Sequence, residues 1–140
     1  MKYQIRYYTR SGNTEKLARA IADAVGDSAK SIDCPLEEKT DILFLGCSYY
    51  AFDMDEAVKK FIAENKQNIG KIVCFGTSAM MRSMKRPMSK VAEEYGVSLA
   101  EEEFHCRGAF GPMHKGRPND KDLEKVADFA KKIINMSGSV

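Results

Sequence analysis

The turn Thr9-Arg10-Ser11-Gly12-Asn13-Thr14 follows the strand-like run Tyr3-Gln4-Ile5-Arg6-Tyr7-Tyr8 and leads into a helical pattern that begins near Glu15. Backbone N–H groups without helical partners and the positive end of the helix dipole meet at such a position. The hydroxyls of Thr9, Ser11 and Thr14 add hydrogen-bond donors, and Gly12 lets the backbone approach a ligand closely. The turn therefore predicts a phosphate site, and the chain is expected to hold a phosphorylated cofactor.

The length and composition indicate an ordinary globular protein. The chain has 140 residues, of which 44% are hydrophobic and 30% charged, and we expect one domain over residues 1–140. It contains no apolar run long enough to cross a membrane, and its first residues lack the pattern of a signal peptide. The four cysteines are scattered without a CxxC pair, which argues against a thioredoxin-like motif or a zinc ribbon. We therefore expect a soluble protein in the reducing cytoplasm.

The charge does not indicate nucleic acid as a partner. The 22 basic and 20 acidic residues leave a formal charge of +2, without a concentrated basic run or an aromatic and arginine motif. We expect neither a nucleic-acid nor a membrane partner, and the sequence leaves the oligomeric state open.

Apolar runs alternate with amphipathic stretches along the chain, which is typical of an α/β fold with a parallel sheet. Five strands are predicted, at about Lys2 to Tyr8, Ala29 to Asp33, Asp41 to Gly46, Lys71 to Gly76 and Val97 to Phe104.

Four helices are predicted between and after these strands. The first ends at Gly26, the second contains Ala57 to Ile62, the third begins near Pro87 and ends at Gly96, and the fourth follows Asn119 as N-cap. Only Met136 to Val140 is expected to be a frayed tail.

Three predicted loops follow strands, and in an open parallel sheet ligands bind beyond the carboxyl ends of the strands where the strand order reverses. Loop one is Thr9 to Thr14, loop two runs from Cys47 to about Met54, and loop three from Thr77 to about Arg86. We expect the three loops to surround one ligand.

The first loop resembles the phosphate loop of flavodoxins at every defined position, and its strand-turn-helix context is the one that this motif requires. Gly46-Cys47-Ser48-Tyr49-Tyr50 resembles the segment whose aromatic residue covers one face of the flavin, with Tyr50 the better match and Tyr49 the second. The resemblance implies a flavodoxin-like three-layer sandwich, with five parallel strands in the order 2-1-3-4-5 and helices on both faces. It implies FMN as cofactor, with the following contacts: Thr9, Arg10, Ser11, Gly12, Asn13, Thr14, Ser48, Tyr49, Tyr50, Thr77, Ser78 and Ala79.

The chain departs from flavodoxins in loop three and in charge. Flavodoxins usually place a second aromatic residue after the fourth strand, whereas Met80 and Met81 stand here, either against the ring or as packing beneath the third helix. Flavodoxins are typically acidic, whereas this chain is slightly basic and carries Arg82, Lys85 and Arg86 near loop three. These charges predict a less strongly reducing flavin or a site for an anionic substrate or nicotinamide phosphate, unless they belong to a solvated helix start.

The connector from Phe104 to Pro118 is longer than most connections in compact domains, and we expect a partner contact, a flap or a loop that covers the sheet edge. Its His105, Cys106 and His114 match no standard metal-ligand spacing, so no metal site is predicted. No catalytic side chain is predicted either, and Cys47 has no base partner in the motif.

Three functions remain open. The first is an FMN-dependent electron carrier that serves redox partner proteins or small-molecule donors and acceptors. The second is a small FMN-dependent NAD(P)H or quinone oxidoreductase, and the third is a flavin-free interaction module on the same fold. A response-regulator receiver is disfavoured because Gly46-Cys47 stands where that domain has an aspartate.

Overall fold

A computed structural model describes residues 1–9, 12–50, 53–78, 83–108 and 116–138. Its centre is a sheet of five parallel strands in the order β2-β1-β3-β5-β6, which confirms the predicted order. The strands are β1 (Tyr3–Tyr7), β2 (Ala29–Ser31), β3 (Thr40–Tyr50), β5 (Ile69–Ser78) and β6 (Ser98–Arg107). A short strand, β4 (Asp53–Met54), pairs antiparallel with the end of β3.

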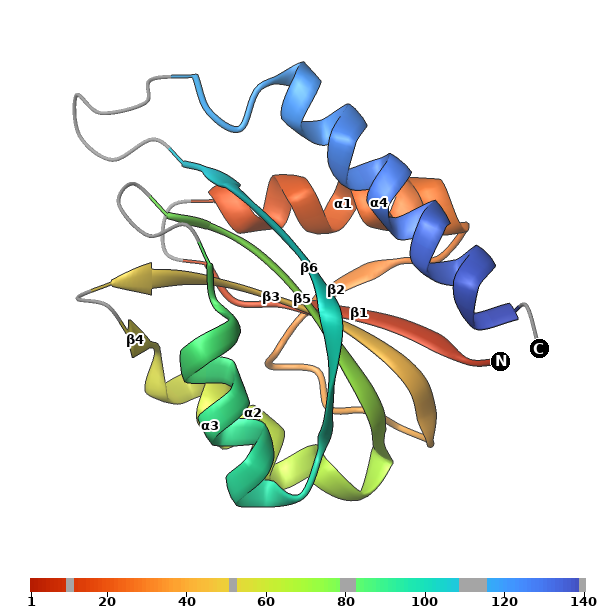
Figure 1. The fold of residues 1–140 in the computed structure, drawn as a ribbon, viewed down its shortest axis with the longest axis vertical. Helices are drawn as coiled ribbons and strands as arrows, with labels where there is room; N and C mark the ends of the chain where they lie inside the picture. The colour runs from red at the N-terminus through yellow and green to blue at the C-terminus, as the bar shows by residue number, and fades with distance from the viewer. Residues whose placement is uncertain (10–11, 51–52, 79–82, 109–115, 139–140) are drawn as a thin grey trace.

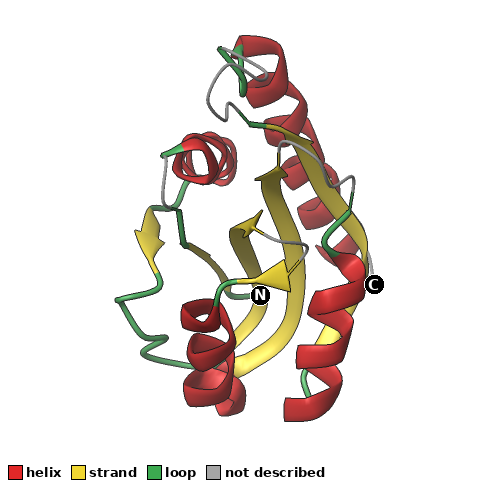
Figure 2. Cartoon of the chain, turned by 90° about the vertical axis from the view of Figure 1, so that its left-hand side faces the viewer, coloured by secondary structure: helices red, strands yellow, loops and turns green. Residues whose placement is uncertain are grey.

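Helices cover both faces of the sheet (Figures 1 and 2). They are α1 (Asn13–Val25), α2 (Glu56–Asn65), α3 (Lys85–Tyr95) and α4 (Asp120–Gly138), and a 3₁₀ turn, Lys66–Asn68, follows α2. Helices α1 and α4 bury one apolar cluster against the sheet, and α2 and α3 bury a second cluster on the opposite face. The result is the expected three-layer arrangement. No helix in the described ranges combines the length and the apolar character that a membrane span needs.

The helix boundaries agree with the local signals. Asn119 caps α4, because its Oδ1 accepts the Asp122 backbone N–H at 3.0 Å and Asp122 Oδ2 accepts the Asn119 backbone N–H at 2.8 Å. Asp55 caps α2 in the same way by accepting the Ala57 backbone N–H at 3.0 Å. Both predicted glycine stops hold, since α1 and α3 have Gly26 and Gly96 as C-caps.

Several predicted boundaries are wrong. Strand β3 continues to Tyr50, because its last residues pair with β5 and β4, so most of predicted loop two is strand. Strand β6 continues to Arg107 through pairing with β5, so the first part of the predicted connector is also strand. Residues 136–138 belong to α4 rather than to a frayed tail.

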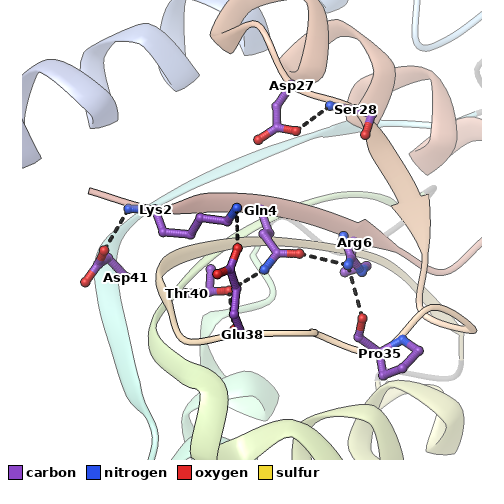
Figure 3. Close-up of polar contacts among 9 residues, drawn as sticks. All are labelled: Lys2, Gln4, Arg6, Asp27, Ser28, Pro35, Glu38, Thr40 and Asp41. Atoms are coloured by element: carbon purple, nitrogen blue, oxygen red, sulfur yellow. Dashed lines mark hydrogen bonds and ion pairs between the residues drawn. The ribbon is translucent and has the colours of Figure 1, made fainter.

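Arg6 holds the segment between β2 and β3 against the sheet (Figure 3). The residue is 3% exposed, and its guanidinium donates to the backbone oxygens of Cys34 at 2.8 Å and Pro35 at 3.2 Å. It also donates to the Ile5 carbonyl and, at 2.8 Å, to Gln4 Oε1. Because neutral oxygens accept from every nitrogen of this buried cation, we assign Arg6 a structural role.

Candidate functional site

The candidate site lies at the carboxyl edge of the sheet, where β1 and β3 run side by side although they are far apart in the sequence. The Tyr8 backbone N–H donates to the Gly46 carbonyl at 2.9 Å, and this bond joins the two strands just before the hydroxyl-rich turn. The strand order reverses between β1 and β3. The predicted phosphate turn thus lies at the topological switch point of the sheet.

The turn itself is closed by a hydrogen bond from the Gly12 backbone N–H to Thr9 Oγ1, at 2.9 Å. Gly12 has φ 87°, a conformation that glycine adopts without the penalty of a side chain, and it stands at the N-cap position of α1. A Cβ placed on Gly12 would meet no heavy atom within 4 Å, so the backbone here faces open space. An open backbone at a helix N-terminus, flanked by hydroxyls, has the donor chemistry that a phosphate requires. Arg10 and Ser11 lie outside the described residues.

Thr14 connects the turn to the end of β5. Its Oγ1 lies 3.2 Å from Thr77 Oγ1, and the two residues are 0% and 2% exposed. Asn13 is also buried, at 7% exposed. The turn before α1 therefore contacts the end of β5, and Thr14 and Asn13 lie beneath the turn, packed inside the protein rather than on its surface.

Gly108, directly after β6, completes this junction. A Cβ at this position would come within 2.9 Å of Thr77 Cβ and 3.0 Å of Asn13 Nδ2, closer than ordinary contacts allow. Only glycine leaves room for α1, β5 and the end of β6 to approach one another here. The sequence analysis did not identify the role of Gly108, because no residue near it in the sequence indicates that it contacts Thr77 and Asn13.

The predicted second loop is an extension of the sheet. Ser48 pairs in register with Thr77 of β5, while Tyr49 and Tyr50 pair with Met54 and Asp53 of β4. Strand pairing thus holds the backbone of the three predicted contact residues, with β5 at Ser48 and with β4 at Tyr49 and Tyr50. The carboxyl end of β3 projects beyond the sheet edge as a hairpin arm (Figure 1).

The third loop begins at Ser78, the last residue of β5, while Ala79 and its neighbours Met80, Met81 and Arg82 lie outside the described residues. Its far end is anchored by Glu103 of β6, whose carboxylate accepts from the Ser83 hydroxyl and, at 3.3 Å, from the Met84 backbone N–H. Glu103 escaped the sequence analysis because 20 residues separate it from Ser83 and no motif links them.

The positive charge expected beside loop three is partly neutralised. Lys85 Nζ lies 2.6 Å from Glu101 Oε2 and 3.2 Å from the Glu101 carbonyl, so this cation faces β6. Arg86 is exposed on the first turn of α3. The observed pairing weakens the argument that a cluster of free cations raises the potential of a bound flavin.

The thiols near the site are poor nucleophiles. Burial raises the pKa of the Cys47 thiol well above its usual value, and burial likewise raises the pKa of Cys74. Burial raises the pKa of Cys106 to about 12. Since the thiolate is the reactive form, these groups are not suited to covalent catalysis. Within the described ranges, no three His, Cys, Asp or Glu side chains come together as a metal site would require.

The chain resembles known proteins over nearly its whole length. No protein-family model matches it. An uncharacterised protein of Methanocaldococcus jannaschii is 27% identical over 87% of this chain and 90% of its own length. A flavodoxin of Clostridium beijerinckii is also 27% identical, over 95% of this chain and 99% of its own length.

Solved structures share the same architecture. A flavodoxin from the domain Archaea superposes with a TM-score of 0.78, at 20% identity, over 97% of this chain and 98% of its own. The chain has the flavodoxin-like fold. A flavoprotein from Lactobacillus acidophilus, solved in complex with FMN, matches with a TM-score of 0.63 and 16% identity over 74% of this chain and 92% of its own. In this fold the start of α1, the end of β5 and the β3 arm lie at the carboxyl edge of the sheet, where open parallel sheets bind their ligands.

Proposed function

We propose that this flavodoxin-like chain binds FMN and carries electrons between redox partners. The observation that supports this most directly is the hydrogen bond between Thr14 and Thr77, which joins the phosphate turn to the start of loop three at the topological switch point. A ligand with a phosphate at one end and a flat ring at the other would span these two segments.

The phosphate would bind at the turn from Thr9 to Thr14. The hydroxyl of Thr9 accepts from the Gly12 backbone N–H, and a hydroxyl that accepts one bond retains a proton to donate. The dipole of α1 would contribute about 0.3–1 kcal/mol, and up to about 2 kcal/mol where the phosphate is partly buried. Arg10 and Ser11 would complete the phosphate contacts.

The flavin ring would lie between the β3 arm and loop three. Tyr50 or Tyr49 would cover one face, and Ser48, Thr77, Ser78 and Ala79 would contact the ring edge. Strand pairing fixes the backbone of the β3 arm, so the aromatic residue would be held in place before the ligand arrives. A bound flavin supplies one- and two-electron chemistry that no side chain here provides.

The phosphate assignment is tested by titrating the apoprotein with FMN and following the quenching of flavin fluorescence. We expect saturable 1:1 binding, weakened about tenfold or more in the double variant Ser11→Ala with Thr14→Ala. Ser11 would lose a charge-assisted hydrogen bond to the phosphate, and the buried Thr14 would no longer hold the turn to the end of β5. The matched control is Ser89→Ala with Ser98→Ala, two exposed serines away from the turn, which should leave the affinity unchanged. Unchanged affinity in the phosphate-turn variant would refute the assigned site.

The ring assignment is tested by Tyr50→Ala in the same titration. We expect weaker binding by about tenfold, since an aromatic stack contributes about 0.5–1.5 kcal/mol beyond the area it buries. A chain that binds no FMN under any of these conditions would instead support the flavin-free interaction module.

Electron carriage is distinguished from catalysis by steady-state assays of the FMN-loaded protein. We expect slow oxidation of NADH or NADPH with quinone acceptors and rapid reduction once a separate flavin reductase is added. Rapid turnover without that reductase would establish the alternative, an FMN-dependent NAD(P)H or quinone oxidoreductase. We also propose that the protein acts in the cytoplasm, whichever of the two activities it has.

A further inference from the structure

A cavity lies at the outer edge of the sheet, between the end of β6 and the start of α4. Its volume is about 400 Å³, within the range of about 300–1,000 Å³ typical of small-molecule sites. The end of β6 forms one side of it through Phe104 to Arg107. The other side comes from Arg117, just before α4, and from Asp122 and Lys125 in the first turns of α4, which packs along β6 (Figure 1).

The lining of this cavity is cationic. Among the described residues that line it, three are cations, Arg107, Arg117 and Lys125, and one is a carboxylate, Asp122, so these residues together carry a formal excess of two positive charges. By contrast, the cavity beside Arg6 is lined by equal numbers of cations and carboxylates among the described residues, and its volume is only about 150 Å³. The cavity beside α4 therefore favours an anion.

The Asp122 carboxylate already accepts hydrogen bonds within the protein, so it repels an anion less than a free carboxylate would. It accepts from Arg117 Nε at 2.6 Å and Arg117 Nη2 at 2.8 Å, and from the Asn119 backbone N–H at 2.8 Å. Burial alone would raise the pKa of Asp122, but the hydrogen bonds from Arg117 and Asn119 outweigh it and lower that pKa. The bidentate pair fixes the Arg117 guanidinium, whose side chain remains 34% exposed. A fixed, partly exposed guanidinium loses little entropy when it binds a ligand.

The cavity is also close to the proposed cofactor site. Arg107 and Cys106 pair in register with Ser78 and Thr77, the residues where loop three begins. Neighbouring strands lie about 4.8 Å apart, so the cavity is one strand away from the predicted ring contacts.

We propose that this cavity binds the phosphate group of a small phosphorylated molecule, held by Arg107, Arg117 and Lys125. Arginine binds phosphate through two parallel N–H bonds, and lysine adds a point charge. The concave shape and the volume favour a small ligand over an extended protein surface. The binding does not depend on FMN, although a redox role for the ligand rests on the proposed function.

The test uses pyrophosphate as probe, added at constant ionic strength to ¹⁵N-labelled protein saturated with FMN, and records amide chemical shifts. We expect saturable shifts at residues 104–107 and 117–125, with a dissociation constant below about 1 mM. FMN occupies the phosphate turn in this sample, and FMN binding is measured separately by fluorescence. If FMN fails to bind, shifts at residues 9–14 and at 104–107 still report the two sites independently.

Arg107→Gln with Lys125→Gln should weaken pyrophosphate binding by about tenfold or more, because charge-assisted contacts are removed. Lys71→Gln with Lys90→Gln changes two exposed lysines outside the cavity and is the control of equal net charge. Lys125 is exposed, so the single variant Lys125→Gln should fold and lets the loss of pyrophosphate affinity be measured if the double variant misfolds. The proposal is overturned by equal weakening in the control, by shifts confined to residues 9–14, or by the absence of saturation up to 10 mM. Tighter binding of a polyglutamate peptide at the same residues would also overturn it, in favour of an acidic protein partner.

Discussion

The hydrogen bond between Thr14 and Thr77 links the stability of the fold to the proposed ligand site, and its contribution to the free energy of unfolding can be measured. Thr14→Val keeps the shape of a side chain that is 0% exposed and removes only its hydroxyl. The lost hydrogen bond contributes about 0.5–1.5 kcal/mol, and the Thr77 hydroxyl loses a partner in a buried position, so we expect a loss of about 1–2 kcal/mol. For a chain of this size, the loss corresponds to a fall in Tm of about 3–7 °C.

A double-mutant cycle isolates the link between the two threonines. Thr14→Val, Thr77→Val and the double variant are unfolded in urea, and we expect a coupling free energy of about 0.5–1.5 kcal/mol. FMN affinity should fall by about tenfold in Thr14→Val, because the residue beneath the phosphate turn no longer holds the end of β5.

Thr40→Val is the matched control for this cycle. Thr40 is 1% exposed, and its hydroxyl accepts from Gln4 Nε2 at 2.6 Å and donates to the Glu38 carbonyl at 3.2 Å, at the opposite end of β3. Its stability loss should be similar, without any change in FMN affinity. Additivity of the two site substitutions within about 0.3 kcal/mol would refute the coupling. A fall in FMN affinity in Thr40→Val as large as in Thr14→Val would refute the local argument.

Three further outcomes follow from the described contacts. Glu103→Gln should lower the free energy of unfolding by about 1–2 kcal/mol and speed amide exchange at Met84, since its carboxylate holds the start of α3; unchanged exchange would contradict this anchoring role. A thiol reagent at pH 8 should label Cys34 quickly and the three buried cysteines only on unfolding, because burial raises the pKa of the latter; a second fast thiol in the native protein would show otherwise. Asp122→Asn should cost about 2 kcal/mol above pH 4, and the deficit should shrink as the pH falls through the lowered pKa of Asp122, whereas a deficit that does not shrink with falling pH would argue against the Arg117 pair as its source.

Local sequence signals predicted the elements of this fold well where the chain carries its own boundary marks. Asn119 and the glycines at 26 and 96 mark helix ends through hydrogen bonds and backbone conformations that depend on nearby residues alone. Strand ends were less predictable, since the length of a strand depends on its partner. Nothing near Ser48 in the sequence indicates that it pairs with Thr77, and so β3 extends further than its apolar run.

The candidate site divides in the same way. The hydroxyl-rich turn could be predicted because strand, turn and helix follow one another along the chain. Its resemblance to flavodoxins extended to the segment from Gly46 to Tyr50, whereas loop three departs from the family. Glu103 and Gly108 could not be predicted, since each acts on residues far away in the sequence, and their roles arise from the register of β6 against β5.

The sequence by itself determined the alternation of strands and helices and the position of the hydroxyl-rich turn at a helix N-terminus, because these depend on periodicity and on groups adjacent along the chain. The strand order and the class of cofactor were implied by the resemblance to flavodoxins. Only the tertiary structure decided that Thr14 faces inward to Thr77, that Lys85 pairs with Glu101, and that Arg107 and Lys125 line one cavity. Hydrogen bonds and charges act over a few ångströms in space, and only the folded sheet brings such distant residues within that range.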